Sequence, residues 1–323
     1  MTLETLLPLL GDPIQAPEEE TFHLFSQQLP SRNLGFVDSK ATTLELAVAD
    51  RDLTIHQSPG ILSSTRAGGT TGAVVWKITP LFAEWISSRT TSPLFAHGIL
   101  SQSSLAIELG CGTSSIVGLL LAPRIAHYVL TDQAYVAKLV EQNIAENHHG
   151  TAAAPAVKGG KSRVATQKGG SNSSKHHRAR HPSPRGPAKT GGDGDGGQIR
   201  FTALDWETDE VTPALTGSKA ARSFDAVIAC DCIYNESLVE PFVATCVDVC
   251  RLREQEAANS SSPRITAEPC VCVVAQQLRN SDVFEAWLTC FAESFRVWRV
   301  PDELLSKGLQ SDSGFVVHVG VLK

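Results

Sequence analysis

The fold is decided by the stretch SLAIELGCGTSS, which spans residues 104–115. Its apolar residues, interrupted only by Glu108, predict a buried strand over 105–109, and the apolar residues that follow predict a helix over 114–121. Gly110 and Gly112 let the backbone between strand and helix turn tightly and approach a ligand, because neither carries a Cβ. We therefore expect a ligand-binding turn at the carboxyl end of a central parallel strand.

Outward from this stretch, strands and helices alternate along the chain. Further strands are predicted over 127–131, 201–204, 225–230, 271–275, 295–300 and 315–322, and further helices over 135–146, 238–251 and 283–291. Such alternation is typical of an α/β protein with a Rossmann-like, doubly wound, seven-stranded sheet. No helical pattern separates the last two strands, so we expect the sheet to be mostly parallel with an antiparallel last strand.

Two segments depart from this alternation. Alternating apolar residues over 43–48 and 53–56 predict a β-hairpin within an N-terminal extension (1–75) that precedes the main domain (76–323), and the acidic run 18–20 predicts a solvated helix face. Residues 151–197 are rich in Gly, Ser, Pro and basic residues and nearly lack large apolar ones, which predicts a disordered insertion. Because it connects a helix to a strand, we expect it at the sheet edge opposite the ligand.

Charge is distributed unevenly. The chain carries a net charge of −6, but residues 151–197 contain nine Lys or Arg and two Asp, which leaves −13 for the rest. An acidic body suits a basic partner and disfavours a nucleic-acid backbone. We find no apolar run long enough for a membrane span and no signal-peptide pattern. The eight cysteines are therefore expected to be reduced. The pairs Cys230/Cys232 and Cys270/Cys272 lie in strand-like runs and are interpreted as small buried apolar side chains, with no metal site expected.

The residues around the glycine turn discriminate between two cofactors. Ser115 stands where a dinucleotide fingerprint has its third glycine, and Glu108 directly precedes the turn. A pyrophosphate favours backbone N–H groups and no nearby carboxylate, whereas the cationic amino-acid tail and sulfonium of S-adenosyl-L-methionine tolerate one. The turn thus favours S-adenosylmethionine. A nicotinamide-dependent oxidoreductase remains the less favoured enzyme.

Polar and aromatic residues also follow the next three strands. Asp132 ends the second strand, where a carboxylate can accept both ribose hydroxyls of a nucleoside or cap the following helix. Trp206 follows the third strand, where an indole can stack on adenine. Asp231 and Tyr234 follow the fourth strand and point to the same crevice, and Ala229 leaves room beside a ligand.

This set of motifs resembles the seven-β-strand protein-lysine methyltransferases. The segments that carry the resemblance are Val75-Trp76, 108–113, Thr131-Asp132, Asp205-Trp206 and 231–234, and it covers roughly residues 43–148 and 199–323. The helix end NIAEN (143–147) and the segment 233–236 are most similar to the fungal ribosomal lysine methyltransferase branch, the group of ribosomal lysine N-methyltransferase five and methyltransferase-like twenty-one proteins. The basic insertion departs from the family pattern.

The resemblance implies roles for individual residues. It implies S-adenosylmethionine contacts for Trp76, the turn Gly110-Cys111-Gly112, Asp132, Trp206 and Ala229, and it matches the family's acidic-x-x-aromatic motif to Asp231 and Tyr234. The acceptor lysine must lose a proton from an amine with a pKa of about 10.4. Desolvation lowers that pKa, Asp231 would accept a hydrogen bond from the amine, and Tyr234 and Trp76 would wall its slot. A structural role for Asp231 is the alternative.

The resemblance also implies a partner, a basic ribosomal protein methylated on lysine by a monomeric enzyme of the cytoplasm and nucleus. The basic segment 151–197 is expected to contribute a weak RNA contact or to act only as filler. A rival from another class is a non-catalytic Rossmann-like module that scaffolds ribosome assembly.

Overall fold

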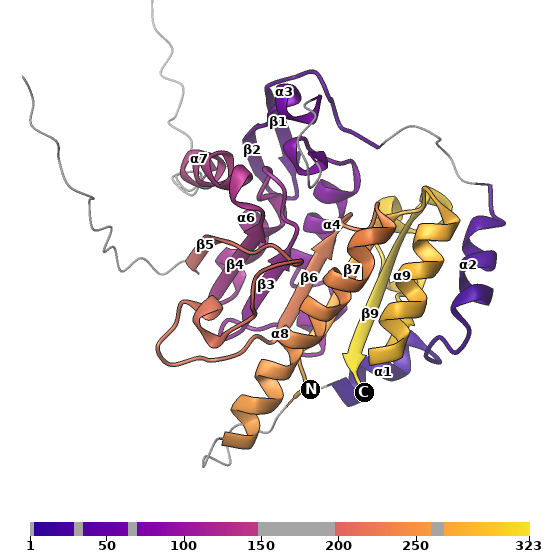
Figure 1. Cartoon of the computed structure of the whole chain (residues 1–323). Helices are drawn as coiled ribbons and strands as arrows, with labels where there is room; N and C mark the ends of the chain where they lie inside the picture. Colours follow the sequence, from indigo (N-terminus) through magenta and orange to yellow (C-terminus); the bar gives the residue numbers. More distant parts are fainter. Residues whose placement is uncertain (1–2, 29–34, 64–69, 148–197, 260–267) are drawn as a thin grey trace, which may run out of the picture. The chain divides into compact units, whose positions relative to one another are not determined.

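A seven-stranded sheet organises the computed structural model, which describes residues 3–28, 35–63, 70–147, 198–259 and 268–323 (Figure 1). Its strands are β3 (Leu105–Leu109), β4 (His127–Asp132), β5 (Gln198–Ala203), β6 (Ala226–Cys230), β7 (Val271–Gln277), β8 (Phe295–Arg299) and β9 (Phe315–Leu322). The strand order is β5-β4-β3-β6-β7-β9-β8. β3 to β7 run parallel, and β9 is antiparallel to both of its neighbours. The expected sheet and its antiparallel last strand are confirmed.

Helices cover both faces of the sheet (Figure 1). One face packs on α4 (Ile78–Ser87), α6 (Ile116–Leu121) and α7 (Ala137–Asn147), and the other on α2 (Pro17–Phe25), α8 (Val239–Asn259) and α9 (Ser281–Ser294). Alternate residues of a strand point to opposite faces, so Ala106 faces the first helical layer and Ile107 the second. The strands are therefore buried on both sides, which is why they read as nearly continuous apolar runs.

Short elements connect these layers. They are α1 (Leu3–Leu10), α3 (Pro59–Leu62), α5 (Pro93–Ala96) and the 3-10 turns η1 (Thr71–Ala73), η2 (Ala122–Arg124), η3 (Ala134–Val136), η4 (Pro213–Thr216), η5 (Glu236–Leu238), η6 (Asp302–Leu304), η7 (Lys307–Leu309) and η8 (Ser311–Ser313). Among the described residues, no helix is both long and apolar enough to cross a membrane. The predicted insertion over 151–197 lies outside the described residues.

The predicted hairpin is present as β1 (Thr43–Val48) and β2 (Arg51–His56). The sequence placed its turn at 50–52, but the chain reverses one residue earlier, where Ala49 adopts a positive φ of 56°. The hairpin docks on the end of α7 through two buried asparagines. Asn143 exchanges hydrogen bonds with the backbone of His56 at 2.7 and 2.9 Å, and Asn147 does the same with Thr54 at 3.0 and 2.9 Å.

The acidic run before the hairpin is only partly solvated, which corrects the sequence prediction. Glu18 and Glu19 are exposed on α2. Glu20 instead turns toward the sheet and lies 3.4 Å from Arg299 and 3.7 Å from the buried His318. A single helix turn therefore places one of three consecutive carboxylates on the sheet-facing side. This contact joins α2 to β8 and β9.

Seven of the eight cysteines are buried, including the two pairs for which the sequence predicted it, whereas Cys290 of α9 is only partly buried. Cys230, Cys232, Cys246, Cys250, Cys270 and Cys272 are buried and unbridged, as is Cys111. They occupy strand and helix faces that point into the two apolar layers. Within the described ranges, no cluster of His, Cys, Asp or Glu could hold a metal ion.

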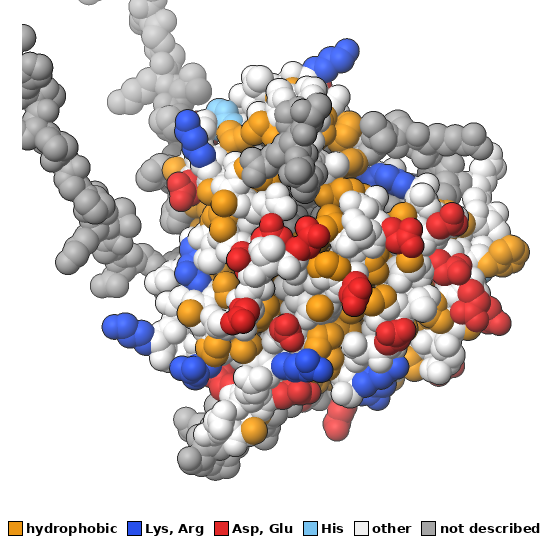
Figure 2. Space-filling view, in the orientation of Figure 1, with side chains coloured by type: hydrophobic (Ala, Val, Ile, Leu, Met, Phe, Trp, Pro, Cys, Tyr) orange, Lys and Arg blue, Asp and Glu red, His pale blue; other side chains and the backbone are white. Residues whose placement is uncertain are grey.

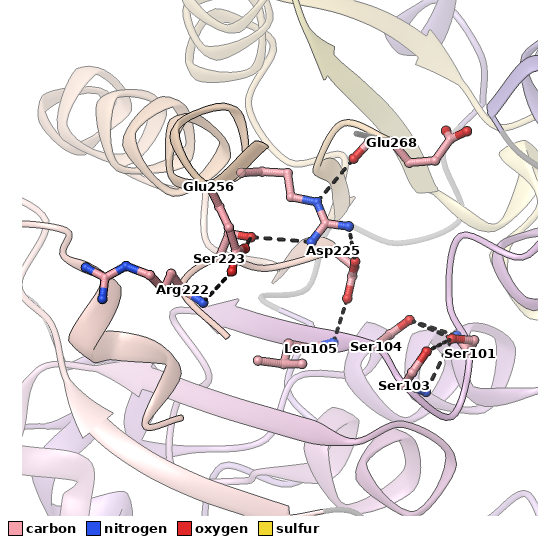
Figure 3. A network of polar contacts seen from close by, with 10 residues as sticks. Ser101, Ser103, Ser104, Leu105, Arg222, Ser223, Asp225, Glu256 and Glu268 are labelled. Carbon is pink, nitrogen blue, oxygen red and sulfur yellow. Dashed lines mark hydrogen bonds and ion pairs between the residues drawn. The ribbon is translucent and has the colours of Figure 1, made fainter. Parts of the chain in front are cut away.

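A polar network closes the amino-terminal edge of the sheet (Figure 3). Asp225, just before β6, accepts a hydrogen bond from the Leu105 N–H at 2.8 Å and pairs with Arg253 of α8 at 2.8 Å. The same guanidinium donates to the Glu268 carbonyl ahead of β7. Burial raises the pKa of Asp225 despite its cationic partner. The network ties together the starts of three adjacent strands at the edge opposite the glycine turn.

Candidate active site

A cavity opens at the carboxyl ends of β3, β4, β5 and β6. It encloses about 850 Å³ including its open mouth. β4 and β6 lie on opposite sides of β3, so the cavity sits where the strand order reverses, the usual ligand position of a doubly wound sheet. The lining residues are Thr71, Gly72, Val74, Trp76, Thr79, Glu108, Gly110, Cys111, Gly112, Ser114, Asp132, Gln133, Tyr135, Leu204, Asp205, Trp206, Cys230, Asp231, Cys232, Tyr234 and Leu238.

All but one of the site residues named from the sequence line this cavity. They are Trp76, Glu108, Gly110, Cys111, Gly112, Asp132, Trp206, Asp231 and Tyr234. Ala229 does not: it is fully buried and belongs to the apolar layer under α8, in register with Leu109. Its small side chain fits between the sheet and α8, whereas the next residues, 230–232, line the cavity.

The glycine turn forms a tight cradle. Gly110 and Gly112 have positive φ angles of 71° and 58°. A Cβ on Gly110 would lie 2.7 Å from the Cys232 sulfur and 3.2 Å from Trp206, and one on Gly112 would lie 3.0 Å from the Gly72 carbonyl. That carbonyl accepts a hydrogen bond from the Thr113 N–H at 2.8 Å. The turn therefore has room only for bare backbone, which leaves its surface open to a ligand.

Asp132 holds the turn from the neighbouring strand. Its carboxylate accepts hydrogen bonds from the Gly112 N–H at 2.9 Å and the Gln133 N–H at 2.7 Å. Burial raises its pKa to about 6, against these two bonds. The helix-capping alternative is not realised, because the turn η3 begins after Gln133 and has no side-chain cap. A carboxylate has about four acceptor sites, so Asp132 can accept further hydrogen bonds from a ligand in the cavity.

Glu108, the second-to-last residue of β3, contributes a second carboxyl group to the cavity. It is buried and accepts a hydrogen bond from the Tyr128 hydroxyl at 2.8 Å. Burial raises its pKa to about 8, and the nearby Asp132 adds to the rise. The side chain is therefore largely protonated at neutral pH in the free protein. A cationic ligand group nearby would favour its ionised form.

Two aromatic residues flank the cavity. Trp206 is half-buried and packs on Phe242 of α8 with ring centroids 5.1 Å apart. Its Nε1 is buried and has no hydrogen-bond partner within the described part of the chain. Tyr234 is 39% exposed at the mouth, and partial burial raises the pKa of its hydroxyl. The indole of Trp206 thus forms one wall of the cavity, and the phenol of Tyr234 remains accessible to a second molecule at the mouth.

The cluster around Asp231 differs from the sequence hypothesis. The Asp231 side chain is fully inaccessible, and its two oxygens accept hydrogen bonds from both terminal nitrogens of Arg279 at 2.7 and 2.5 Å. One oxygen also accepts the Gln277 N–H at 3.1 Å. The guanidinium carbon of Arg279 lies 4.5 Å from the centre of the Trp76 ring. On Trp76 rests Phe36, with ring centroids 4.4 Å apart.

Sequence reasoning missed two parts of the site. Arg279 lies two residues past the end of β7, which neighbours β6, and four residues past the predicted strand 271–275, so its position after a strand was an available signal. The second part is the loop around Thr71 and Gly72, where the sequence over 58–72 is rich in Gly, Ser and Thr and indicates only a connecting loop. It lines the cavity, and the Trp76 ring N–H donates to the Thr71 carbonyl at 3.1 Å. Neither contact is encoded by a local motif.

The family model described as "Lysine methyltransferase" matches residues 55–159 and 191–264, more than half of the chain. The chain belongs to the lysine methyltransferase family. The matched residues contain the glycine turn, Asp132, Trp206 and the segment 231–234, so this lysine methyltransferase keeps its family motifs around the cavity.

Curated relatives agree with the family assignment. Ribosomal lysine N-methyltransferase 5 of Zygosaccharomyces rouxii is 28% identical over 73% of this methyltransferase and 69% of the relative. The protein of the same name from Candida glabrata is 27% identical over 66% and 73%. A diaminohydroxyphosphoribosylamino-pyrimidine deaminase of Schizosaccharomyces pombe shares 30% identity, over 41% of the chain and 31% of its own length.

Among solved structures, the N-methyltransferase NodS of Bradyrhizobium japonicum, a complex with S-adenosyl-L-homocysteine, aligns with a TM-score of 0.35 and 10% identity. That alignment covers 72% of this chain and 90% of NodS.

Proposed function

We propose that this lysine methyltransferase transfers a methyl group from S-adenosyl-L-methionine to a lysine of a ribosomal protein. The observation that carries the proposal is the cavity at the switch point, where the glycine cradle, Asp132 and Trp206 meet. The names of the yeast relatives, both ribosomal lysine N-methyltransferase 5, support the substrate class. A ribosomal substrate also supports a location in the cytoplasm, with a nuclear pool for proteins that assemble there. We further propose that the enzyme acts as a monomer.

The residues present fit the cofactor. The free acceptor sites of Asp132 suit two ribose hydroxyls, and the bare glycine turn suits an amino-acid tail. Trp206 offers an indole face beside a buried N–H that lacks a partner, which suits a flat heterocycle with ring nitrogens. Glu108 supplies a carboxyl group that ionises when a cation binds nearby. When bound, S-adenosylmethionine supplies a methyl group already activated by a sulfonium.

The protein must then present a neutral amine and exclude water. Trp76 and Tyr234 line the cavity near its mouth and form apolar walls that lower the pKa of a lysine side chain entering between them. The Asp231 side chain is inaccessible to solvent and paired with Arg279. We therefore assign Asp231 a positioning role. It holds the Arg279 guanidinium, which lies over the Trp76 ring.

Calorimetric titration with S-adenosyl-L-homocysteine tests the cofactor site. Asp132→Ala should weaken binding at least tenfold, because each hydrogen bond to a charged group contributes about 1.5–3 kcal/mol. Removal of the carboxylate also frees the Gly112 N–H and loosens the cradle. An unchanged affinity in a variant that still melts cooperatively would contradict the assignment. Binding of a nicotinamide dinucleotide instead would favour the oxidoreductase alternative.

The acceptor is tested with labelled S-adenosylmethionine and lysate of cells that lack the endogenous methyltransferase. We expect label in one basic ribosomal protein, with mass spectrometry placing the added mass on a lysine. A folded protein that binds the cofactor and labels nothing would favour the non-catalytic scaffold. Label on a non-ribosomal protein would retain the activity and overturn the substrate class.

A further inference from the structure

A long groove runs between α8 and α9 on the helical layer away from the hairpin. Its floor contains Val239, Val243 and Val247, which recur every four residues along α8, together with Ala244 and Ala286. Residues four apart share one face of a helix, so the valines form a continuous apolar stripe. The three valines are each less than 8% exposed, which places them at the bottom of the groove rather than on its rim.

The rim of this groove is acidic. Six exposed carboxylates border it, and Arg251 is the only basic residue among its described lining residues. The carboxylates are Glu236, Glu240, Asp248, Asp282, Glu285 and Glu293. Arg251 lies 3.6 Å from Asp248 on its own helix, so its charge is already paired. Figure 2 shows acidic side chains gathered around apolar ones on the face that carries these two helices.

Carboxylates of both helices contribute to the electrostatic potential in the groove. Cys290 of α9 lines the groove, and its thiol has a raised pKa because of burial and of the negative charges of Glu293 and Glu240. One of these residues belongs to α9 and the other to α8. The groove thus carries negative potential across its width, which attracts a cationic ligand and repels a phosphate backbone.

The groove begins beside the mouth of the cavity. The turn η5 connects the two, because Glu236 at its start lines the groove and Leu238 at its end lines the cavity. The exposed Tyr234 lies two residues before Glu236. A chain segment bound in the groove could therefore continue toward the slot between Tyr234 and Trp76.

We propose that the α8/α9 groove docks a Lys/Arg-rich segment with interspersed apolar side chains, belonging to the protein substrate and distinct from the methylated lysine. The inference rests on the proposed function, since it names where that substrate is held. The acidic rim provides charge complementarity, and the valine stripe provides the apolar contact. A second copy of this chain is a poor occupant, because two copies meeting here would bring two acidic rims together.

A designed peptide tests the groove directly. The probe is a fluorescein-labelled helix of about 18 residues, with Lys and Arg on one face and Leu at every third or fourth position on the other. The variant Glu240→Gln/Glu285→Gln/Glu293→Gln removes three rim charges. Each exposed ion pair contributes only modestly, so fluorescence anisotropy should show that the peptide binds the triple variant about tenfold more weakly than it binds the wild type. Unchanged affinity overturns the proposal.

A matched control separates the groove from net charge. Glu4, Glu18 and Glu19 are exposed carboxylates outside the groove, on α1 and α2. The variant Glu4→Gln/Glu18→Gln/Glu19→Gln changes the charge by the same amount and should bind the peptide as the wild type does. Equal weakening in both variants overturns a site at α8/α9. Sedimentation that shows a wild-type dimer dissociated only by the groove variant also overturns the proposal, because the occupant is then a second copy.

Cofactor binding and labelling rate together distinguish a failure of this inference from a failure of the proposed function. The groove variant should bind S-adenosylhomocysteine with wild-type affinity, since none of the three residues lines the cavity. Its initial rate of labelling in methylation-deficient lysate should nevertheless fall several-fold, while the control variant keeps the wild-type rate. Full labelling by the groove variant overturns docking and leaves the enzyme assignment intact. A wild type that binds no S-adenosylhomocysteine overturns the function itself.

Discussion

At the scale of single residues, burial determines the chemistry of Glu108. Its pKa is about 8 in the folded protein and 4.5 in an ordinary environment. Between these values the native state holds a proton that the unfolded chain has released, so folding stability from this group falls as pH rises. The slope for one such proton is at most about 1.4 kcal/mol per pH unit. Below pH 4.5 the contribution is fully present, and above about pH 8 it is lost.

In the wild type, ionisation of Glu108 should lower the unfolding free energy between pH 5 and pH 8. We predict that Glu108→Gln reduces this decline by a few kcal/mol, because the amide cannot ionise. Its carbonyl can still accept the hydrogen bond from the Tyr128 hydroxyl. Urea titrations of both proteins across this range measure the effect. Asp132, whose pKa is also raised by burial, titrates in both proteins and cancels in the comparison. Parallel curves would show that Glu108 is ionised in the folded protein.

A second residue-scale prediction concerns Asp231 and Arg279. Replacing Arg279 by Lys keeps the charge but removes the two-pronged contact with Asp231 and the planar stacking on Trp76. We expect kcat to fall by about tenfold to a hundredfold with little change in the affinity for S-adenosylhomocysteine, because displaced walls misalign the acceptor. Steady-state kinetics and calorimetry separate the two quantities.

The double variant Asp231→Ala/Arg279→Ala provides the control. If the two side chains act as one unit, the double variant should lose less activity than the two single losses combined. Additive losses would mean that Asp231 acts on the substrate independently of Arg279, as the sequence hypothesis held.

A site residue could be predicted where the sequence around it carries the signal, and could not where its role depends on a contact with a distant residue. Gly110, Asp132 and Trp206 each follow a strand that is readable from its apolar run, and parallel strands bring their carboxyl ends to one edge. The pairing of Asp231 with Arg279 spans 48 residues and depends on side-chain geometry that no spacing records. Ala229 shows the converse: it adjoins the site in sequence, yet the two-residue period of β6 turns it into the apolar layer.

At the scale of elements, the hairpin β1-β2 supports the glycine turn through α7. The Asn143 amide donates to the Thr113 carbonyl at 2.6 Å as well as to the hairpin. Asn143→Ala removes these bonds and leaves the backbone groups of His56 and Thr113 buried without partners. We expect a loss of about 2–4 kcal/mol in unfolding free energy and weaker cofactor binding. Chemical denaturation measures the first and calorimetry the second.

The control for this element is Gln142→Ala, which changes an exposed neighbour on the same helix. It should alter stability by less than about 0.5 kcal/mol. A loss in Asn143→Ala no larger than this would mean that the hydrogen bonds of Asn143 contribute little to holding the hairpin. The sequence indicated the hairpin and this helix end separately, but their docking joins residues 87 positions apart and required the fold.

At the scale of the whole molecule, alternation of strands and helices was sufficient to predict the sheet, because crossovers between parallel strands are usually helices. The connection from β5 to β6 is an exception, since it contains only the turn η4. The helix α1 was not predicted and α2 was indicated only by its acidic run, since both are short and owe their positions to tertiary contacts. α2, for example, packs Leu24 beneath α9 and places Glu20 against Arg299. Such short helices are stabilised mainly by packing against the sheet and its helices, and only weakly by their own sequence.

The last prediction concerns residues 151–197. α7 ends at Asn147 and β5 begins at Gln198, in register with His127 at the start of β4. The carboxyl end of β4 carries Asp132, so the start of β5 lies at the sheet edge away from the cavity. Replacing 151–197 by a short Gly/Ser linker should therefore preserve cooperative unfolding and S-adenosylhomocysteine affinity, because lengthening or shortening a surface connection changes closure entropy only slowly.

The same deletion separates two roles of the basic charge. Removal of its +7 charge should reduce salt-dependent binding to RNA if the segment contacts an anionic particle, since such attraction depends on counterion release. Gel-shift assays at two salt concentrations measure this, whereas melting and calorimetry measure the fold and the cofactor site. A deletion protein that unfolds cooperatively yet no longer binds S-adenosylhomocysteine would contradict the placement. The connection between α7 and β5 would then have to contribute to the cavity despite starting at the opposite edge of the sheet.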